Sequence, residues 1–454
     1  MRAKDAPVID IDTFLDGLKF NRFHLTVLVL CTLLAAIDGY ELYVVGWVLP
    51  KLADDLGVAR TDITSAMIAQ QVGMLVGAFI VPPLADRFSR PRILFACYAG
   101  MMLSALGILQ THSLFSFAAL RFVAGFCGTA MIPILVTLVS EAAPTRLRAT
   151  LSTITVAGTM IGSLIGAGMQ AYVLEPFGWH GAFWIAALMP AIMLPLIWFF
   201  LPESMRWLGA RNPDDPAIER LARRMQPHGE PVHVHGFKGD PPPPRRRRIG
   251  LPTAILGPGQ RLKTFLMWAV SISSFVFITA GVWKTTIFKD VIGLDWQRVA
   301  AINATNTVAG FVGMLVIGAF IDRFGFKVMM TATFTLGALG AVMIGILAPG
   351  PGMYGAVVLM ALFQHGGQAG LAAMAAALYP PSHRATGVGW AYGAGRIASI
   401  FAPLFGNYVL HNDFGPVAIF ALLAVPLASA AIFSFLLMSL PNAPRITRAD
   451  LRHG

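Results

Sequence analysis

Long apolar stretches separated by short polar turns make up most of the chain. Twelve of them are about 20 to 27 residues long, which is enough for a helix to cross the roughly 30 Å hydrocarbon core of a bilayer. They lack the period-two alternation of barrel strands, and a helix satisfies its own backbone hydrogen bonds in lipid. The pattern therefore predicts helical spans at about 25–48, 61–82, 93–112, 114–140, 150–173, 181–201, 263–286, 296–321, 326–348, 353–379, 385–411 and 415–440.

A long polar interval divides these spans into six and six. We expect an N-terminal segment, a first six-helix bundle, a central loop, a second bundle and a tail, at 1–24, 25–201, 202–262, 263–440 and 441–454. The central loop contains the run PPPPRRRR at 241–248, after a mixed, amphipathic stretch near 215–225. A solvated linker against anionic lipid headgroups explains the run better than a specific binding motif.

Composition agrees with a membrane protein. Hydrophobic residues make up 56% of the chain and charged residues 13%, and the mean hydropathy is +0.67. The net charge of +11 resides almost entirely in loops, without the basic stripe and interleaved aromatics of a nucleic-acid-binding surface, so no nucleic-acid partner is expected. Three cysteines fall within spans without metal-ligand spacing, and no metal is expected: Cys31, Cys97 and Cys127.

The basic residues also predict the orientation of the chain. With the N-terminus in the cytoplasm, 27 of the 34 lysines and arginines fall inside and 5 outside, the latter at Lys51, Arg60, Lys284, Lys289 and Arg298. Because positive charge favours the cytoplasmic side, both termini are predicted to be cytoplasmic. The N-terminal segment contains acids and no early apolar core, so the first span is expected to target the chain to the membrane.

Two carboxylates interrupt the first predicted span. A charge near the centre of a membrane helix costs at least ~2.5 kcal/mol on insertion scales, so it persists mainly where it faces protein or water. Asp38 and Glu41 are three residues apart and share a helix face. Glu41 and Arg121 each lie roughly 10 Å from the outer end of their spans, so they are able to pair. The hypothesis is a proton-coupling site, and the alternative is a static ion pair that fixes helix packing.

A second set of polar residues lies near the predicted midplane. Arg396 and His365 are each roughly 17 Å from the face where their span enters. A guanidinium presents a planar fork that fits a carboxylate, so Arg396 is a candidate for binding an organic anion, with His365 as a polar contact, a proton relay or a packing residue. Further candidates for contact with substrate are Tyr40, Trp390, Tyr392, Asn303, Asn306, Gln364 and Gln368.

A charged turn occurs twice, after the second and eighth spans. Asp86-Arg87 and Asp322-Arg323 occupy equivalent places, which argues for two related halves, as in transporters built from parallel repeats. Near the first copy, ion pairs are expected to close an inner gate, although topology marking by positive charge explains the arginines nearly as well. The gating candidates are Asp86, Arg87, Arg90, Glu141, Arg146, Arg148, Asp322 and Arg323.

Both turns resemble the G-x-x-x-D-R-x-G-R-[RK] loop motif of the major facilitator superfamily. The first copy departs from it at Pro82, Ser89 and Pro91, and the second at Phe326. Other stretches resemble the aromatic acid:proton symporters of that superfamily: DGYE from residue 38, RFVAGFCGTAMIP from 121, SEAAPTRLRAT from 140, PESMRWL from 202 and YPPSHRATGVGWAYGAGRIASIFAP from 379. The resemblance implies two pseudo-symmetric six-helix bundles in a bacterial cytoplasmic membrane.

The function implied is import of an aromatic carboxylate, such as benzoate or a hydroxybenzoate, by proton symport through alternating access. Alternatives are a proton-coupled carrier of another organic anion, such as a dicarboxylate, or a non-transporting sensor derived from the fold. No nucleotide-binding glycine loop, metal cluster or nucleophile with a placed base is present, so neither an enzyme nor an ATP-driven pump is expected. We expect no cofactor, and a monomer whose partners are a small aromatic acid, a proton and the lipid bilayer.

Overall fold

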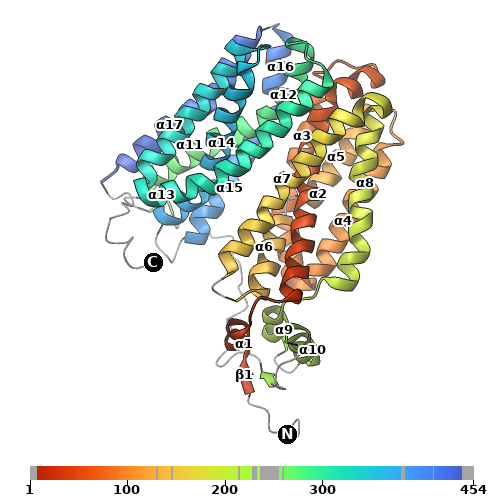
Figure 1. The fold of residues 1–454 in the computed structure, drawn as a ribbon, viewed down its shortest axis with the longest axis vertical. Coiled ribbons are helices and arrows are strands. Elements are labelled where there is room, and N and C mark those ends of the chain that lie inside the picture. Colours follow the sequence, from red (N-terminus) through yellow and green to blue (C-terminus); the bar gives the residue numbers. More distant parts are fainter. Residues whose placement is uncertain are drawn as a thin grey trace. The chain divides into compact units, whose positions relative to one another are not determined.

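The computed structural model describes residues 8–128, 131–144, 147–212, 215–226, 233–235, 255–257, 260–379, 384–412 and 414–441. Helices make up most of this part of the chain (Figure 1). The first half contains β1 (Val8–Asp10), α1 (Ile11–Gly17), α2 (Arg22–Leu56), α3 (Thr64–Phe88), α4 (Arg90–Ile108), α5 (Leu114–Gly128), α6 (Met131–Ala142), α7 (Arg148–Tyr172) and α8 (Leu174–Phe200). After these come α9 (Met205–Arg211), α10 (Pro216–Met225) and β2 (His233–His235), and β1 pairs with β2 in parallel.

The second half begins with a long helical segment of changing geometry. It consists of α11 (Arg261–Ala280), the 3₁₀ turn η3 (Gly281–Trp283), the short α12 (Lys284–Thr286) and the π-helical turn η4 (Ile287–Val291). The remaining helices are α13 (Trp296–Leu347), α14 (Gly352–Leu378), α15 (Arg384–Ser399), α16 (Pro403–His411) and α17 (Pro416–Ser439).

Eleven segments of the described chain are long and apolar enough to cross a membrane. The eleventh predicted span, 385–411, is not among them and consists of α15 and α16, which have 16 and 9 residues and are separated at residues 400–402. Pro403 opens α16, and proline has no backbone N–H to continue a preceding helix. The seventh span differs from its prediction in length, because it continues to Val291 instead of ending at residue 286.

The repeated turn has the same backbone feature in both halves. Ser89 has a φ of 110° and Gly325 a φ of 80°, and both follow the sequence Asp-Arg-Phe. In each copy the arginine guanidinium lies 5.3 Å from the centroid of the phenylalanine ring. A left-handed φ suits glycine, which explains Gly325, whereas Ser89 adopts it against the preference of a residue with a Cβ atom.

The helices form two compact units by their internal contacts. Unit 1 comprises residues 1–42, 72–162 and 183–247, and unit 2 comprises 43–71, 163–182 and 248–454. Four helices run from one unit into the other: α2, α3, α7 and α8. Unit 2 therefore contains one end of each of these helices as well as the second half of the chain. The predicted domain boundaries at residues 201 and 263 stay a prediction.

Inside unit 1, α2 and α7 pack backbone to backbone. A Cβ atom added to Gly158 would overlap the carbonyl oxygen of Thr32, and one added to Gly162 would overlap that of Ala36. The four-residue spacing places both glycines on one face of α7. Their missing side chains let α2 approach closely, and this contact fixes the position of the acid-bearing part of α2.

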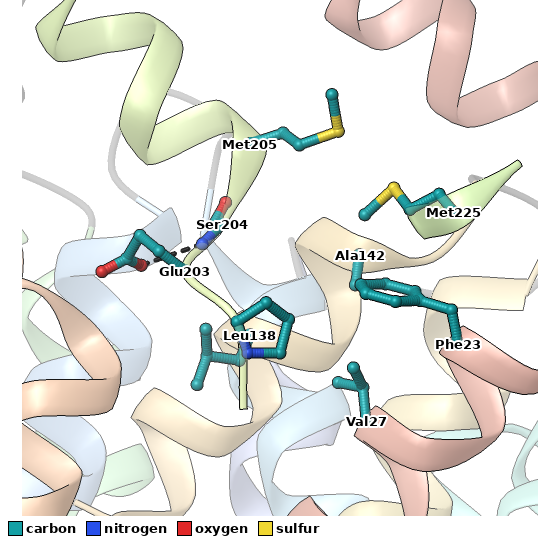
Figure 2. A pocket seen from close by; sticks show the side chains of 9 residues that line it. Phe23, Val27, Leu138, Ala142, Glu203, Ser204, Met205 and Met225 are labelled. Carbon is teal, nitrogen blue, oxygen red and sulfur yellow. Dashed lines mark hydrogen bonds between the residues drawn. The ribbon is translucent and has the colours of Figure 1, made fainter. Parts of the chain in front are cut away.

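In a second, smaller hydrophobic core, the N-terminal segment packs against the beginning of the central loop. In unit 1, Phe14 and Leu15 of α1 pack with Met205 of α9 and Leu221 of α10. Figure 2 shows the neighbouring cavity, which Met205 and Met225 line together with Phe23 and Val27. Its volume of about 10 Å³ has room for about one water molecule at most, so it is too small to hold an aromatic acid. The predicted amphipathic stretch thus forms α10, whereas the run PPPPRRRR lies outside the described residues.

Candidate functional site

Glu41 on α2 and Arg121 on α5 form a buried ion pair in unit 1. Arg121 Nη1 lies 2.6 Å from Glu41 Oε1, and Arg121 Nη2 donates to the Glu41 carbonyl oxygen at 3.2 Å. Arg121 is fully buried, and Glu41 is 7% exposed. The Arg121 guanidinium also lies 5.9 Å from the centroid of the Phe183 ring. A guanidinium that contacts both the side chain and the backbone of residue 41 responds directly to the charge of that carboxylate.

Asp38 lies one turn before Glu41 and has different surroundings. Its side chain is partly exposed, and its Oδ1 atom lies 3.4 Å from the position that a Cβ atom would take on Gly128 of α5. Close by, Tyr98 of α4 donates its hydroxyl to the carbonyl oxygen of Leu34 at 2.9 Å. Asp38 therefore faces α4 and α5 from α2, in a place that is more open than the Glu41–Arg121 pair. The different exposure of the two carboxyl groups affects how readily each exchanges a proton with water.

Tyr40 stands between these acids in sequence but is buried in the helix packing. Its side chain is 1% exposed, and its backbone lies against Gly162 of α7. This position fits a packing role at least as well as contact with a substrate. The contact with substrate that the sequence suggests for Tyr40 stays a prediction.

Polar residues in unit 2 form a network that we call the Gln170 cluster, consisting of Gln170, Thr285 and Asn303. Asn303 Nδ2 donates to Gln170 Oε1 at 2.6 Å, and Gln170 Nε2 lies 3.4 Å from the Thr285 hydroxyl. Gln170 comes from α7, Thr285 from α12 and Asn303 from α13. Asn303 was predicted as a polar contact for substrate, and here it joins helices of the two sequence halves.

A second polar group, the Lys284 cluster, consists of Lys284, Asn306 and His365. Lys284 Nζ donates to Asn306 Oδ1 at 3.4 Å. The His365 ring lies against Gly310, one turn after Asn306 on α13. All three side chains are partly exposed. The sequence identified Asn306 and His365, but it placed Lys284 at the outer end of a span because the predicted span stopped at residue 286.

The remaining predicted substrate residues lie on α14 and α15. Gln368 Oε1 accepts a hydrogen bond of 2.6 Å from Ser274 of α11, and Gln364 is buried. On α15, the Tyr392 ring packs edge-on against Phe275 at 5.5 Å, and Trp390 lies 6.0 Å from Trp268, both distances between ring centroids. Arg396 is partly exposed and lies one turn after Tyr392. The faces of α11 and α15 that meet are therefore rich in aromatic rings near a guanidinium.

The predicted gating residues include one strong ion pair. Arg90 and Glu141 are joined by two hydrogen bonds, which fasten α4 to α6 within unit 1. Arg90 N also donates to Glu203 Oε2 at 3.0 Å. Arg148 Nη2 lies 3.8 Å from Asp16 Oδ1 of α1, and the Arg87 carbonyl accepts a hydrogen bond from Arg211.

Four gating candidates remain: Asp86, Arg146, Asp322 and Arg323. Arg146 lies outside the described residues, as do the side chains of Asp86 and Asp322. Arg323 is exposed on α13, where it lies over Phe324. The gating role of the whole set stays a prediction.

Sequence reasoning missed an ion-pair group at the predicted outer side of unit 2. Arg60, between α2 and α3, lies 2.8 Å from Asp54 Oδ1 and 2.6 Å from Asp290 Oδ2. Burial lowers the pKa of the Arg60 guanidinium, but the hydrogen bonds to Asp290 and Asp54 outweigh burial and hold that pKa above its ordinary value. Arg60 therefore stays charged and links α2 to η4.

The chain is similar along nearly its whole length to curated transporters of aromatic acids. The gallate transporter of Pseudomonas putida is 31% identical over 431 residues, which cover 94% of each chain. The 4-hydroxybenzoate transporter PcaK of Acinetobacter baylyi is 28% identical over 433 residues, again 94% of each chain. The structure of the xylose transporter XylE from E. coli, in its inward-open conformation, has a TM-score of 0.73 at 14% identity and covers 94% of this chain and 99% of its own.

The family follows from a match along most of the sequence. The model of the Major Facilitator Superfamily matches residues 31–354 and 266–453. This agrees with the helical spans and with the turn repeated in both halves. The chain is an integral membrane transporter and belongs to the Major Facilitator Superfamily.

Proposed function

We propose that this transporter imports an aromatic carboxylate together with a proton across the bacterial cytoplasmic membrane. The observation that carries the proposal is the buried Glu41–Arg121 pair, one turn from Asp38, inside a membrane-spanning helix. The aromatic class of substrate is supported by the names of the relatives, which transport gallate and 4-hydroxybenzoate. Positive charge in the loops supports cytoplasmic termini.

Proton coupling needs a group whose contacts change with its charge. While Glu41 is ionised, it neutralises Arg121 at 2.6 Å. When the carboxyl takes up a proton, the attraction falls and Arg121 is free to change partners, which alters the packing of α2 against α5. Asp38 is more exposed and is the better candidate for exchanging the proton with water. Glu41 and Arg121 then convert that exchange into a change of helix position.

An aromatic carboxylate needs a cation for its charged end and rings for its flat face. In unit 2, Arg396 offers a guanidinium fork, and Tyr392 and Phe275 offer an edge-on aromatic pair beside it. Asn303, Asn306 and Gln368 already make hydrogen bonds with side chains of unit 2, so they suit the recognition of ring hydroxyls only if those bonds exchange during transport.

Uptake into proteoliposomes tests the proposal. With an inward proton gradient, labelled 4-hydroxybenzoate should accumulate above its external concentration, and a protonophore should abolish this accumulation. Asp38→Asn should retain counterflow exchange but lose uphill accumulation. Proton-driven accumulation at the wild-type level in that variant would refute the role of Asp38.

The same assay separates the alternatives. Competition by aliphatic dicarboxylates, without competition by benzoate or gallate, would point to a carrier of another organic anion. Binding of an aromatic acid without any flux would point to a sensor. Each outcome is read against empty liposomes and against liposomes containing Asp38→Asn.

A further inference from the structure

The seventh span contains a lysine whose charge has no carboxylate beside it in the described part of the chain. Lys284 Nζ has one hydrogen-bond partner among the described residues, Asn306 Oδ1 at 3.4 Å, and no described acid within 4.0 Å. An ammonium has three donors and is strongly hydrated, so a single long contact leaves it largely unsatisfied inside a membrane protein.

Side chains on a helix normally lean toward its N-terminal end, and Lys284 follows this direction. Lys284 Cε lies 3.1 Å from the place that a Cβ atom would take on Gly281, three residues earlier. The side chain thus lies along the helix toward its N-terminal end, which is the predicted cytoplasmic end of this span. A lysine that only needed water would extend toward the nearer membrane surface. Lys284 instead points toward the predicted midplane, where His365 also lies.

His365 adds a second unsatisfied group to the Lys284 cluster. Its Nδ1 atom is buried and has no hydrogen-bond partner among the described residues. Its ring lies against Gly310, one turn from Asn306, so α12, α13 and α14 each direct one polar side chain to this place. Buried polar atoms in native proteins nearly always have partners, which makes the unsatisfied atoms here informative.

The backbone around Lys284 is irregular as well. The 3₁₀ turn η3 precedes it, and the π-helical turn η4 begins three residues after it. Such departures from α-helical geometry within a helix frequently mark functional sites. Lys284 thus lies in a short α-helical segment between two departures from α-helical geometry.

We propose that Lys284, with Asn306 and His365, binds the carboxylate of the transported acid. The ammonium supplies the charge, the amide of Asn306 positions the ammonium, and the imidazole supplies a further polar contact. This contact adds to the one suggested for Arg396, and it rests on the proposed function because it requires an acid as substrate. A charge-assisted contact of this kind changes affinity by about 10- to 100-fold.

Equilibrium binding to the purified full-length protein in detergent tests the proposal, with two probes of similar shape, one with a carboxylate and one with a neutral amide. The probes are 4-hydroxybenzoate and the neutral 4-hydroxybenzamide. The wild type should bind the acid more tightly than the amide. Lys284→Gln should weaken binding of the acid about 10- to 100-fold and change binding of the amide little, whereas Lys284→Arg should retain most of the preference for the acid.

Two further variants keep the test decisive. Lys289→Gln removes the same charge five residues later, where the ammonium lies 5.2 Å from the centroid of the Trp296 ring, and it should leave both affinities unchanged. Asn306→Asp places a carboxylate beside Lys284, so it should compete with the substrate and weaken binding of the acid even if Lys284→Gln fails to fold.

The outcomes distinguish this inference from the proposed function. If the wild type binds the acid but neither Lys284→Gln nor Asn306→Asp changes the ratio of acid to amide affinity, Lys284 does not bind the carboxylate and the proposed function stands. If the wild type binds no aromatic acid, the proposed function fails, and the role of Lys284 fails with it.

Discussion

Replacing both residues of the Glu41–Arg121 pair distinguishes a role in proton coupling from a purely structural role. Either single variant, Glu41→Gln or Arg121→Gln, leaves one buried charge without its partner. Because Arg121 is fully buried and Glu41 is 7% exposed, each single change should lower the free energy of unfolding by about 3 to 5 kcal/mol. The double variant Glu41→Gln/Arg121→Gln removes both charges, and two amides are able to bond to each other. Its stability should return to within about 1 to 2 kcal/mol of the wild type.

Two measurements are needed on the same four proteins. Titration with SDS in mixed micelles gives the free energies of unfolding and hence the coupling energy of the pair. Uptake into proteoliposomes with an inward proton gradient gives the degree of accumulation. If the pair couples transport to protons, the double variant should be stable but unable to accumulate substrate. A double variant that regains both stability and uphill uptake would show that the pair only fixes helix packing.

A second ion pair with the same spacing but more exposure to water provides a reference for the coupling energy. Arg60 and Asp290 lie 2.6 Å apart, as close as Glu41 and Arg121, but their side chains are 32% and 26% exposed. Exposed pairs contribute about 0 to 1 kcal/mol because water screens them. The cycle with Arg60→Gln and Asp290→Asn should therefore give a coupling energy several-fold smaller than that of the buried pair. Equal values for the two cycles would mean that burial does not determine the strength of the Glu41–Arg121 pair.

Three further predictions concern packing, backbone strain and pH. Gly162→Ala should lower stability by about 1 to 3 kcal/mol in the SDS titration because its Cβ atom overlaps Ala36, whereas Gly168→Ala on the same helix meets open space and should not. Ser89→Gly should raise stability by about 1 kcal/mol because the φ of 110° suits glycine; lower stability would mean that the serine side chain contributes more than the strain costs. Burial raises the pKa of Glu203, and the bond with Ser89 opposes this only in part, so the folded state binds this proton more tightly than the unfolded state. The contribution of Glu203 to the free energy of unfolding is thus fully present below the ordinary glutamate pKa and is lost as pH rises through the pKa of the folded state. Glu203→Gln should remove this loss of stability. A difference in the free energy of unfolding between the two proteins that stays constant across pH would contradict the prediction.

The spans and the acid–arginine pair were predictable because they depend on local properties of the chain. Apolar length determines where a helix crosses, and counting residues from the span ends placed Glu41 and Arg121 at equal depth before any contact was known. The repeated turn was recognisable for a similar reason, since Asp-Arg-Phe in equivalent places of the two halves is a short local signal. The interruption between α15 and α16 at Pro403 carried a weaker signal, because the flanking residues are apolar on both sides.

The polar clusters of unit 2 were harder to predict because they depend on helix rotation. Gln170 carries no sign in the sequence that it bonds to Asn303, more than a hundred residues away. Lys284 was assigned to the outer end of a span because apolar length did not reveal the 3₁₀ and π-helical turns that extend the span to Val291. The core between α1 and α10 was not predicted because its members, such as Phe14 and Leu221, lie far apart in the sequence.

The charged residues within the spans say more about the transported molecule than the fold does. XylE has the same architecture at 14% identity, so the fold alone does not determine what is carried. In unit 1, α2 carries two acids, Asp38 and Glu41, and Arg121 forms its ion pair with Glu41. In unit 2, Lys284 and Arg396 are both cationic, and in the described residues no acid lies within 4.0 Å of Lys284. These positions support the proposed import of a proton with an organic anion, in which the acids on α2 bind the proton and the two cations of unit 2 bind the anion.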